Sequence, residues 1–331
     1  MTVIDRIALP EPADGTTEVH FAVASGLADR VHLLRAKEIH AVNAAIAAGR
    51  PLLVRGEPGI GKSQLARAAA KELGRAFVTH VIDSHTESRD LMWTFDAVSR
   101  LAEAQLAGSL RQDLADARRE LAVENYLHPG PLWWAFDWAG AERQRISAKG
   151  RAPSQPDGGD WRNGCVLLLD EIDKAESEVP NGLLEALGTR EFTPFGCSEP
   201  VRAIGHPPLV VITTNEERAL PDAFLRRCLV LHLRLPEDET ELTNFLTERG
   251  RAHFRQEIDE TVLRAAAKML YDDRQNAIKN QITPLPGQAE YLDLLRATLG
   301  LAEETPGSQI AMLEIVAEYT LKKHVGLGAA D

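Results

Sequence analysis

Five short apolar runs, separated by segments with helical spacing, organise the first two thirds of the chain. Apolar runs bounded by turn residues predict buried strands, and apolar side chains three or four positions apart predict helices. Strands that alternate with helices favour an α/β fold, in which helices cover both faces of a parallel sheet. The predicted strands are 51–55, 76–82, 165–169, 209–213 and 228–233, and the predicted helices are 36–48, 64–73, 180–187 and 219–225.

The pattern changes after Pro236, because residues 237–331 show helical spacing only. We therefore expect a boundary near residue 236, between an α/β domain of residues 19–236 and a small all-helical domain of residues 237–331. Residues 1–18 carry two prolines, a glycine and scattered polar side chains, which predict an extended or loose leader.

A long interval, residues 83–164, separates the second predicted strand from the third. It holds a helical stretch over 97–123 and ends in a segment, 150–164, whose Pro, Gly, Ser and Asp residues predict a mobile surface loop. Buried aromatic side chains mostly pack against their own core, although these could instead face a partner. All five tryptophans of the chain lie in this interval: Trp93, Trp133, Trp134, Trp138 and Trp161.

Composition narrows the class of protein. The chain has 331 residues, of which 44% are hydrophobic and 26% charged, as in soluble globular proteins. Its net charge of −12 argues against a broad nucleic-acid-binding surface, which needs clustered positive charge. The three cysteines are isolated, which predicts free thiols in a reducing compartment. No signal pattern and no membrane-length apolar run stands out, so we expect a cytoplasmic protein that binds no membrane.

The segment GEPGIGKS, residues 56–63, fits the phosphate-binding pattern G-x-x-x-x-G-K-[ST]. It lies between a predicted strand and a predicted helix, so backbone N–H groups at a helix N-terminus can face an anion. Lys62 would reach the β- and γ-phosphates of a nucleoside triphosphate, and the Ser63 hydroxyl would ligate Mg²⁺. The predicted nucleotide-binding residues are Gly56, Glu57, Pro58, Gly59, Ile60, Gly61, Lys62, Ser63, Gln64 and Asp170.

An acidic pair, Asp170 and Glu171, follows the apolar run 166–169. Side chains at the carboxyl end of a parallel strand face the ligand crevice of such a sheet. Asp170 would hold Mg²⁺, and Glu171 would orient and deprotonate the attacking water. Acids at the end of a strand can simply meet solvent, but their position about a hundred residues after a phosphate loop favours the catalytic interpretation.

Two further segments carry candidate residues. Asn215 follows the strand 209–214, where its amide could bond the γ-phosphate and the water or simply cap a helix. Arg226 and Arg227 stand at a helix end before a strand. They could be solvated there, or they could project to the phosphate of a neighbouring subunit and stabilise its transition state.

The segments GEPGIGKS, VLLLDE, TTNEE and LPDAFLRRC, in this order, resemble the MoxR-type AAA+ ATPases of the dynein-related and helix-2-insert clade. The resemblance covers about residues 20–331. It implies a P-loop NTPase αβα sandwich with strand order 5-1-4-3-2, followed by a helical lid. Residues 56–63 match Walker A, Asp170 and Glu171 match Walker B, Asn215 matches sensor 1, and Arg227 matches the arginine finger better than Arg226.

The resemblance also implies a function, that of a chaperone-like remodelling protein that hydrolyses ATP with Mg²⁺ as a hexameric ring. A protein client follows from this, and a separate von Willebrand factor A domain protein is an expected partner. The interval 83–164 resembles the helix-2 insertion, and residues 192–202 resemble a pore-directed hairpin. The sensor 2 region, 284–290, holds no arginine. This departure suggests an alternative, a nucleotide-gated assembly module of a bacterial conflict system with slow turnover.

Overall fold

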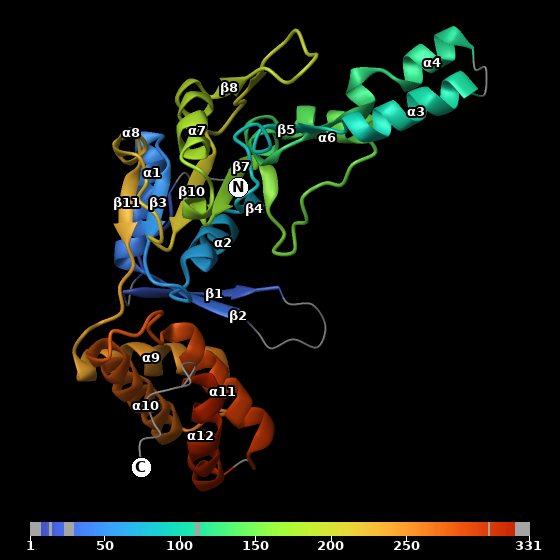
Figure 1. Cartoon of the computed structure of the whole chain (residues 1–331). Coiled ribbons are helices and arrows are strands. Elements are labelled where there is room, and N and C mark those ends of the chain that lie inside the picture. Colours follow the sequence, from blue (N-terminus) through green and yellow to red (C-terminus); the bar gives the residue numbers. More distant parts are fainter. Residues whose placement is uncertain (1–7, 13–14, 23–29, 110–112, 304, 322–331) are drawn as a thin grey trace, which may run out of the picture. The chain divides into compact units, whose positions relative to one another are not determined.

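The computed structural model describes residues 8–12, 15–22, 30–109, 113–303 and 305–321 (Figure 1). The chain divides into two compact units. The first unit comprises Met1–Glu11, Ala36–Val54 and Ala66–Leu231, and the second comprises Pro12–Arg35, Arg55–Leu65 and His232–Asp331. The phosphate loop, residues 56–63, therefore groups with the C-terminal helices rather than with most of the sheet.

The first unit is built on a five-stranded parallel sheet. Numbered along the chain, its strands have the order 5-1-4-3-2, so the predicted α/β fold and strand order are confirmed. The central strand β10 is buried along its whole length, as expected for a strand covered on both faces. Across the sheet the strands are β11 (Leu229–His232), β3 (Leu52–Arg55), β10 (Leu209–Thr214), β7 (Asp160–Asp170) and β4 (Arg75–Val81).

Helices connect these strands and pack on them. One apolar cluster joins side chains of β3, β4, β7 and β10 with Leu183 of α7 and Phe224 of α8, both fully buried. Burial of such side chains is the main stabilising term of the unit, at about 1.5–3 kcal/mol for each large one. The helices along this part of the chain are α1 (Ala36–Ala48), α2 (Lys62–Glu72), η2 (Ile172–Lys174), α7 (Glu178–Thr189) and α8 (Asp222–Leu225).

The interval between β4 and β7 folds into its own set of elements. Helices α3 (Ala97–Ser109) and α4 (Leu114–Glu120) form where the sequence predicts one helical stretch, and residues 110–112 lie outside the described part. No residue of either helix is buried, and Figure 1 shows the pair extending away from the sheet. The other elements are β5 (Trp93–Phe95), η1 (Val123–Tyr126), β6 (Leu127–Pro129), α5 (Pro131–Phe136) and α6 (Trp138–Ser147).

Four of the five tryptophans pack into the core of the first unit. Trp133 and Trp134 are buried, and Trp93 and Trp138 pack against the same cluster. The rings of Trp93 and Trp133 lie 5.9 and 6.2 Å from Phe192, in the hairpin of β8 (Glu191–Phe192) and β9 (Val201–Arg202). The packing interpretation therefore holds for these four, whereas Trp161 is 39% exposed.

The segment 150–164, predicted as a mobile surface loop, includes the start of a strand and is held by side-chain contacts. Strand β7 already begins at Asp160, and the Gln155 amide makes two hydrogen bonds of 2.8 Å with the backbone of Phe77. Asp157 pairs with Arg67 at 2.6 Å. Because β4 is an edge strand, its outer N–H and C=O groups need partners, and the Gln155 side chain supplies them.

The second unit combines an antiparallel hairpin with the C-terminal helices. The hairpin pairs β1 (Thr16–Phe21), which begins inside the predicted leader segment, with β2 (Arg30–Arg35). Tyr291 is fully buried among the helices, where its hydroxyl donates to Leu263 O at 3.2 Å. Among the described residues no helix is both long and apolar enough to cross a membrane. The helices are α9 (Glu239–Phe254), α10 (Glu260–Lys279), α11 (Gln288–Leu301) and α12 (Pro306–Thr320).

Candidate functional site

The carboxyl end of β7 carries the predicted acidic pair in a defined geometry. The Glu171 N–H donates to Thr213 Oγ1 at 2.9 Å, and that hydroxyl donates to Asp170 Oδ1 at 2.5 Å. Thr213 is fully buried in β10, the neighbouring strand. One hydroxyl therefore orients both acids. The sequence pattern did not single out Thr213, because a buried β-branched residue in a strand is ordinary.

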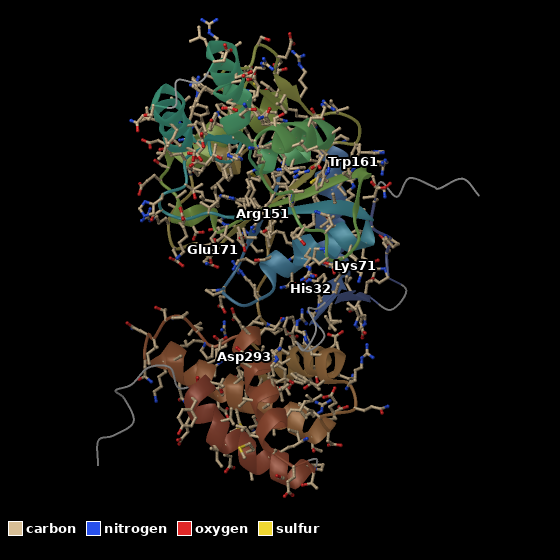
Figure 2. All side chains as sticks on the ribbon, turned by 90° about the vertical axis from the view of Figure 1, so that its right-hand side faces the viewer. His32, Lys71, Arg151, Trp161, Glu171 and Asp293 are labelled. Carbon is tan, nitrogen blue, oxygen red and sulfur yellow. The ribbon has the colours of Figure 1, made fainter. Side chains whose placement is uncertain are left out.

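Glu171 itself adopts a left-handed backbone, with φ of 62° and ψ of 49°. A residue with a Cβ rarely occupies this region, which costs on the order of 1–2 kcal/mol and recurs at functional sites. Figure 2 labels Trp161, near the start of β7, and Glu171, which directly follows the end of that strand.

Asn215, one residue beyond β10, reaches the same place. Its amide Nδ2 donates to Glu171 Oε1 at 3.3 Å, so the structure brings two predicted catalytic residues together. The buried Asp173 carboxylate accepts from the backbone N–H groups of Asn215 and Glu217, at 3.3 and 3.0 Å. Asp173, which sequence reasoning also missed, therefore fixes the loop after β10 against the loop after β7.

Two ion pairs join these loops at the surface. Lys174 pairs with Glu217 at 2.5 Å, and Arg218 pairs with Glu176 at 3.3 Å. The hydrogen bond to Glu217 raises the pKa of Lys174 above its ordinary value. Because both pairs are exposed, solvent screens them, and the main restraint comes from the buried Asp173.

The phosphate loop, residues 56–63, links β3 to α2. Lys62 is buried and its ammonium donates to the carbonyl oxygens of Gly56 and Glu57, at 2.8 and 2.9 Å. Gly59 has a φ of 75°, and a Cβ there would lie 2.6 Å from the Ala289 Cβ. Glycine is therefore required at this position by both conformation and space. Ser63 and Gln64 lie in the first turn of α2.

A cation from the C-terminal helices contacts the phosphate loop. Arg274 of α10 donates to Glu57 Oε1 at 2.6 Å and to Pro286 O at 2.9 Å, and its side chain is only 11% exposed. Residues 284–290, where the resemblance implies a lid arginine, contain none. Arg274 lies on the preceding helix, 217 positions from Glu57, and no local motif identifies it.

Arg226 and Arg227 lie at the end of the sheet opposite to Glu171 and Asn215. They precede β11, at the amino ends of the parallel strands, whereas Glu171 and Asn215 follow the carboxyl ends of β7 and β10. The six residues of β10 span about 20 Å. Both arginines are exposed, and Arg227 donates to Leu184 O at 3.1 Å. Within one copy, the predicted finger is therefore not brought to the acids.

The comparisons with known proteins agree with these motifs. A family model for the AAA domain of the dynein-related subfamily matches residues 51–228, more than half of the chain. The chain belongs to this AAA family. In this AAA protein the matched segment includes the phosphate loop, the acidic pair, Asn215 and Arg227. Among curated proteins no sequence matched.

Among solved structures, one match is a candidate ATPase from Cytophaga hutchinsonii. The alignment covers 86% of this AAA protein and 79% of the other chain, at 15% identity and a TM-score of 0.37.

AAA domains generally bind ATP with Mg²⁺, and the residues present fit that pair. Mg²⁺ prefers oxygen ligands and is usually held by one or two protein groups together with phosphate oxygens. The Ser63 hydroxyl and the Asp170 carboxylate are ligands of this kind. Among the described residues, no group of three or more His, Cys, Asp or Glu side chains could hold a metal by itself.

Proposed function

We propose that this AAA protein is an ATP-hydrolysing remodelling protein of the MoxR type, which acts on a protein client as an oligomeric ring. The observation that carries the proposal is the hydrogen bond from Asn215 to Glu171, at the carboxyl ends of β7 and β10. An amide and a carboxylate on neighbouring strands can hold one water between them for attack on a phosphate. A phosphate loop follows β3 of the same sheet.

Each residue of the proposed ATPase site has one role. Lys62 and the N–H groups of residues 56–64 bind the phosphates, and Glu171 is the general base. Ser63 and Asp170 would hold Mg²⁺, and the ion would supply positive charge next to the phosphates. Asn215 positions the water. Thr213 fixes the Glu171 backbone and the Asp170 carboxylate, so the two acids need little reorganisation before the reaction.

The placement of Arg227 supports hydrolysis between copies of the chain. Arg227 and Glu171 lie at opposite ends of the strands. The Arg227 guanidinium would therefore contact the ATP of a neighbouring copy, not the ATP of its own copy. A closed ring of such head-to-tail contacts, hexameric as the resemblance implies, supplies every site with one arginine. Arg226 is the second candidate for this role.

The exposed helices α3 and α4 of the insertion fit a protein client better than a nucleic acid. Val98 and Leu101 of α3 and Leu114 of α4 are 80, 61 and 68% exposed, in a helix pair that Figure 1 shows extending from the first unit. Exposed apolar side chains of this kind suit a protein surface. We propose that residues 83–164 contact the client or a separate von Willebrand factor A domain partner, in the cytoplasm. In this proposal residues 19–236 are the nucleotide-binding domain and residues 237–331 are the helical lid domain.

A second candidate function is a nucleotide-gated assembly module with slow turnover. It is favoured by the contact of Arg274 with Glu57, because a lid arginine engaged with a carboxylate is not free to contact phosphate. Steady-state ATP turnover and ATP-dependent oligomer formation, measured on the same preparation, separate the two functions. Rapid turnover that a client stimulates supports remodelling. Assembly with ATP in the absence of appreciable turnover contradicts remodelling and supports gating.

A further inference from the structure

Three arginines line one small pocket at the amino edge of the sheet. The pocket has a volume of about 220 Å³ and is bounded by the α1–β3 turn, the end of α7 and the end of α8. Arg50, Arg190 and Arg227 contribute its charged groups, and Leu184 and Phe224 are among its apolar ones. A volume of this size holds several waters, at about 30 Å³ each, and so admits a phosphate group.

Backbone carbonyl oxygens, and not carboxylates, hold the three guanidinium groups. Arg50 donates to Arg226 O, Arg190 to Gly49 O at 3.2 Å, and Arg227 to Leu184 O at 3.1 Å. These bonds hold the side chains in place, but a neutral carbonyl does not cancel a positive charge. A guanidinium has five N–H donors, so most of the donors in the pocket remain available for a ligand.

The pocket is positively charged, whereas the chain as a whole is negatively charged. The protein has 49 acidic and 37 basic residues, yet no acidic residue lines the pocket. Among the described residues, none of the three arginines forms an ion pair with a carboxylate. Like charges several ångströms apart near a surface repel by ~1 kcal/mol or more, and a bound anion would remove that repulsion. Guanidinium groups match phosphate oxygens in a two-pronged geometry.

We propose that Arg50 and Arg190 join Arg227 in a phosphate-binding pocket whose occupant is the terminal phosphate of an ATP held by a second copy of the chain. This inference rests on the proposed ATPase function. The pocket lies at the sheet edge opposite Glu171, so the ATP of the same copy cannot fill it. Arg190 occupies the left-handed position that ends α7. Arg50 lies two residues before β3, and its N–H donates to Ala45 O at 3.1 Å, so both residues have defined backbones.

Inorganic phosphate tests the pocket independently of hydrolysis. The full chain with Lys62→Ala removes the predicted phosphate-loop contact, and its melting temperature is measured with increasing phosphate at constant ionic strength. We expect phosphate to raise the melting temperature, and the rise to disappear when Arg50→Gln and Arg190→Gln are added. Arg162→Gln, an exposed arginine elsewhere, serves as the control and should keep the rise. If phosphate still raises the melting temperature after both substitutions, the proposal that this pocket binds phosphate is wrong.

Mixtures of two variants test whether the phosphate belongs to an ATP held by a second copy of the chain. Arg50→Gln and Arg190→Gln should each lower kcat at least about tenfold while leaving the Kd for ATP within about twofold, because the phosphate loop is intact. Either variant, mixed with Lys62→Ala, should regain activity, since each copy supplies the half that the other lacks. Arg50→Lys and Arg190→Lys, which keep the charge, should recover part of kcat.

The two experiments separate the ways in which the account can fail. Phosphate binding in a chain that hydrolyses no ATP would reject the proposed function but keep the pocket. If phosphate binds but the mixtures regain no activity, the occupant of the pocket is free phosphate. That result would reject the claim that the phosphate belongs to an ATP held by a second copy of the chain. Wild-type kcat in Arg50→Gln and Arg190→Gln would overturn the inference while leaving ATP hydrolysis established.

Discussion

The Arg274 guanidinium donates a 2.6 Å hydrogen bond to the Glu57 carboxylate, which joins helix α10 to the phosphate loop within the second unit. Arg274 also holds the segment before α11 through Pro286 O. Since Gly59 faces Ala289 at close range, the loop and the start of α11 are packed together as well. A movement of the phosphate loop on binding ATP would therefore be transmitted to the C-terminal helices.

The energetic coupling of this pair can be measured by a double-mutant cycle. We expect Arg274→Met to destabilise the protein, because it leaves a partly buried Glu57 carboxylate without its cation. Adding Glu57→Gln should recover part of the loss, with a coupling free energy of about 0.5–3 kcal/mol from urea unfolding. Additive effects of the two substitutions would contradict the link between loop and lid.

Thr213→Val should separate nucleotide binding from hydrolysis. Valine has nearly the same shape but lacks the hydroxyl that accepts from Glu171 N and donates to Asp170. We expect kcat to fall about tenfold or more, because a small displacement of a catalytic group is costly. The Kd for ATP should change little. Thr213→Ser keeps the hydroxyl and is the matched control, so equal kcat values for both variants would exclude the positioning role.

Lys62→Ala should weaken ATP binding strongly. The Lys62 ammonium is the only charged group that the pattern of residues 56–63 directs at the β- and γ-phosphates. Equilibrium binding of labelled ATP measures the loss, with Lys71→Ala, at the other end of α2, as the control. An ATP affinity close to wild type in Lys62→Ala would refute the phosphate-loop assignment.

Acid should destabilise the second unit through His253. Burial lowers the pKa of His253 to about 4, with the nearby positive charge of Arg296 adding to the effect. The unfolded chain therefore takes up a proton near pH 6.5 that the folded chain refuses until about pH 4. Unfolding free energy should fall as the pH drops through this window.

His253→Gln should remove this part of the pH dependence, because glutamine does not titrate. Melting temperatures measured between pH 7 and pH 5 should fall less steeply for the variant than for the wild type. His85→Gln, at an exposed histidine, should leave the slope unchanged. Identical slopes for wild type and His253→Gln would show that His253 is not kept neutral by burial.

The features that could be predicted from the sequence are those that depend on a local pattern of residues. Apolar runs predict the five strands, and Asp170 and Asn215 are identified because acids and amides at strand ends meet at one edge of a parallel sheet. Thr213, Asp173 and Arg274 were missed. Their partners lie 42 to 217 positions away along the chain, so no spacing reveals the contacts.

The same reasoning explains the errors in the insertion. Residues 150–164 have the composition of a mobile loop, but composition does not reveal that β4 is an edge strand. The Gln155 amide orders the loop because that edge needs hydrogen-bond partners. Likewise, helical spacing over 97–123 predicts helix without locating the break between α3 and α4.

Hydrolysis by Glu171→Gln tests the central claim most directly. Glutamine keeps the shape and an oxygen for the Asn215 amide but cannot accept the proton of the attacking water. Steady-state ATP turnover should fall by about 100-fold or more, while the Kd for ATP stays near the wild-type value. Glu176→Gln, at an exposed acid of the same loop, should turn over ATP normally. Normal turnover by Glu171→Gln would contradict the account, because the general base would then lie elsewhere.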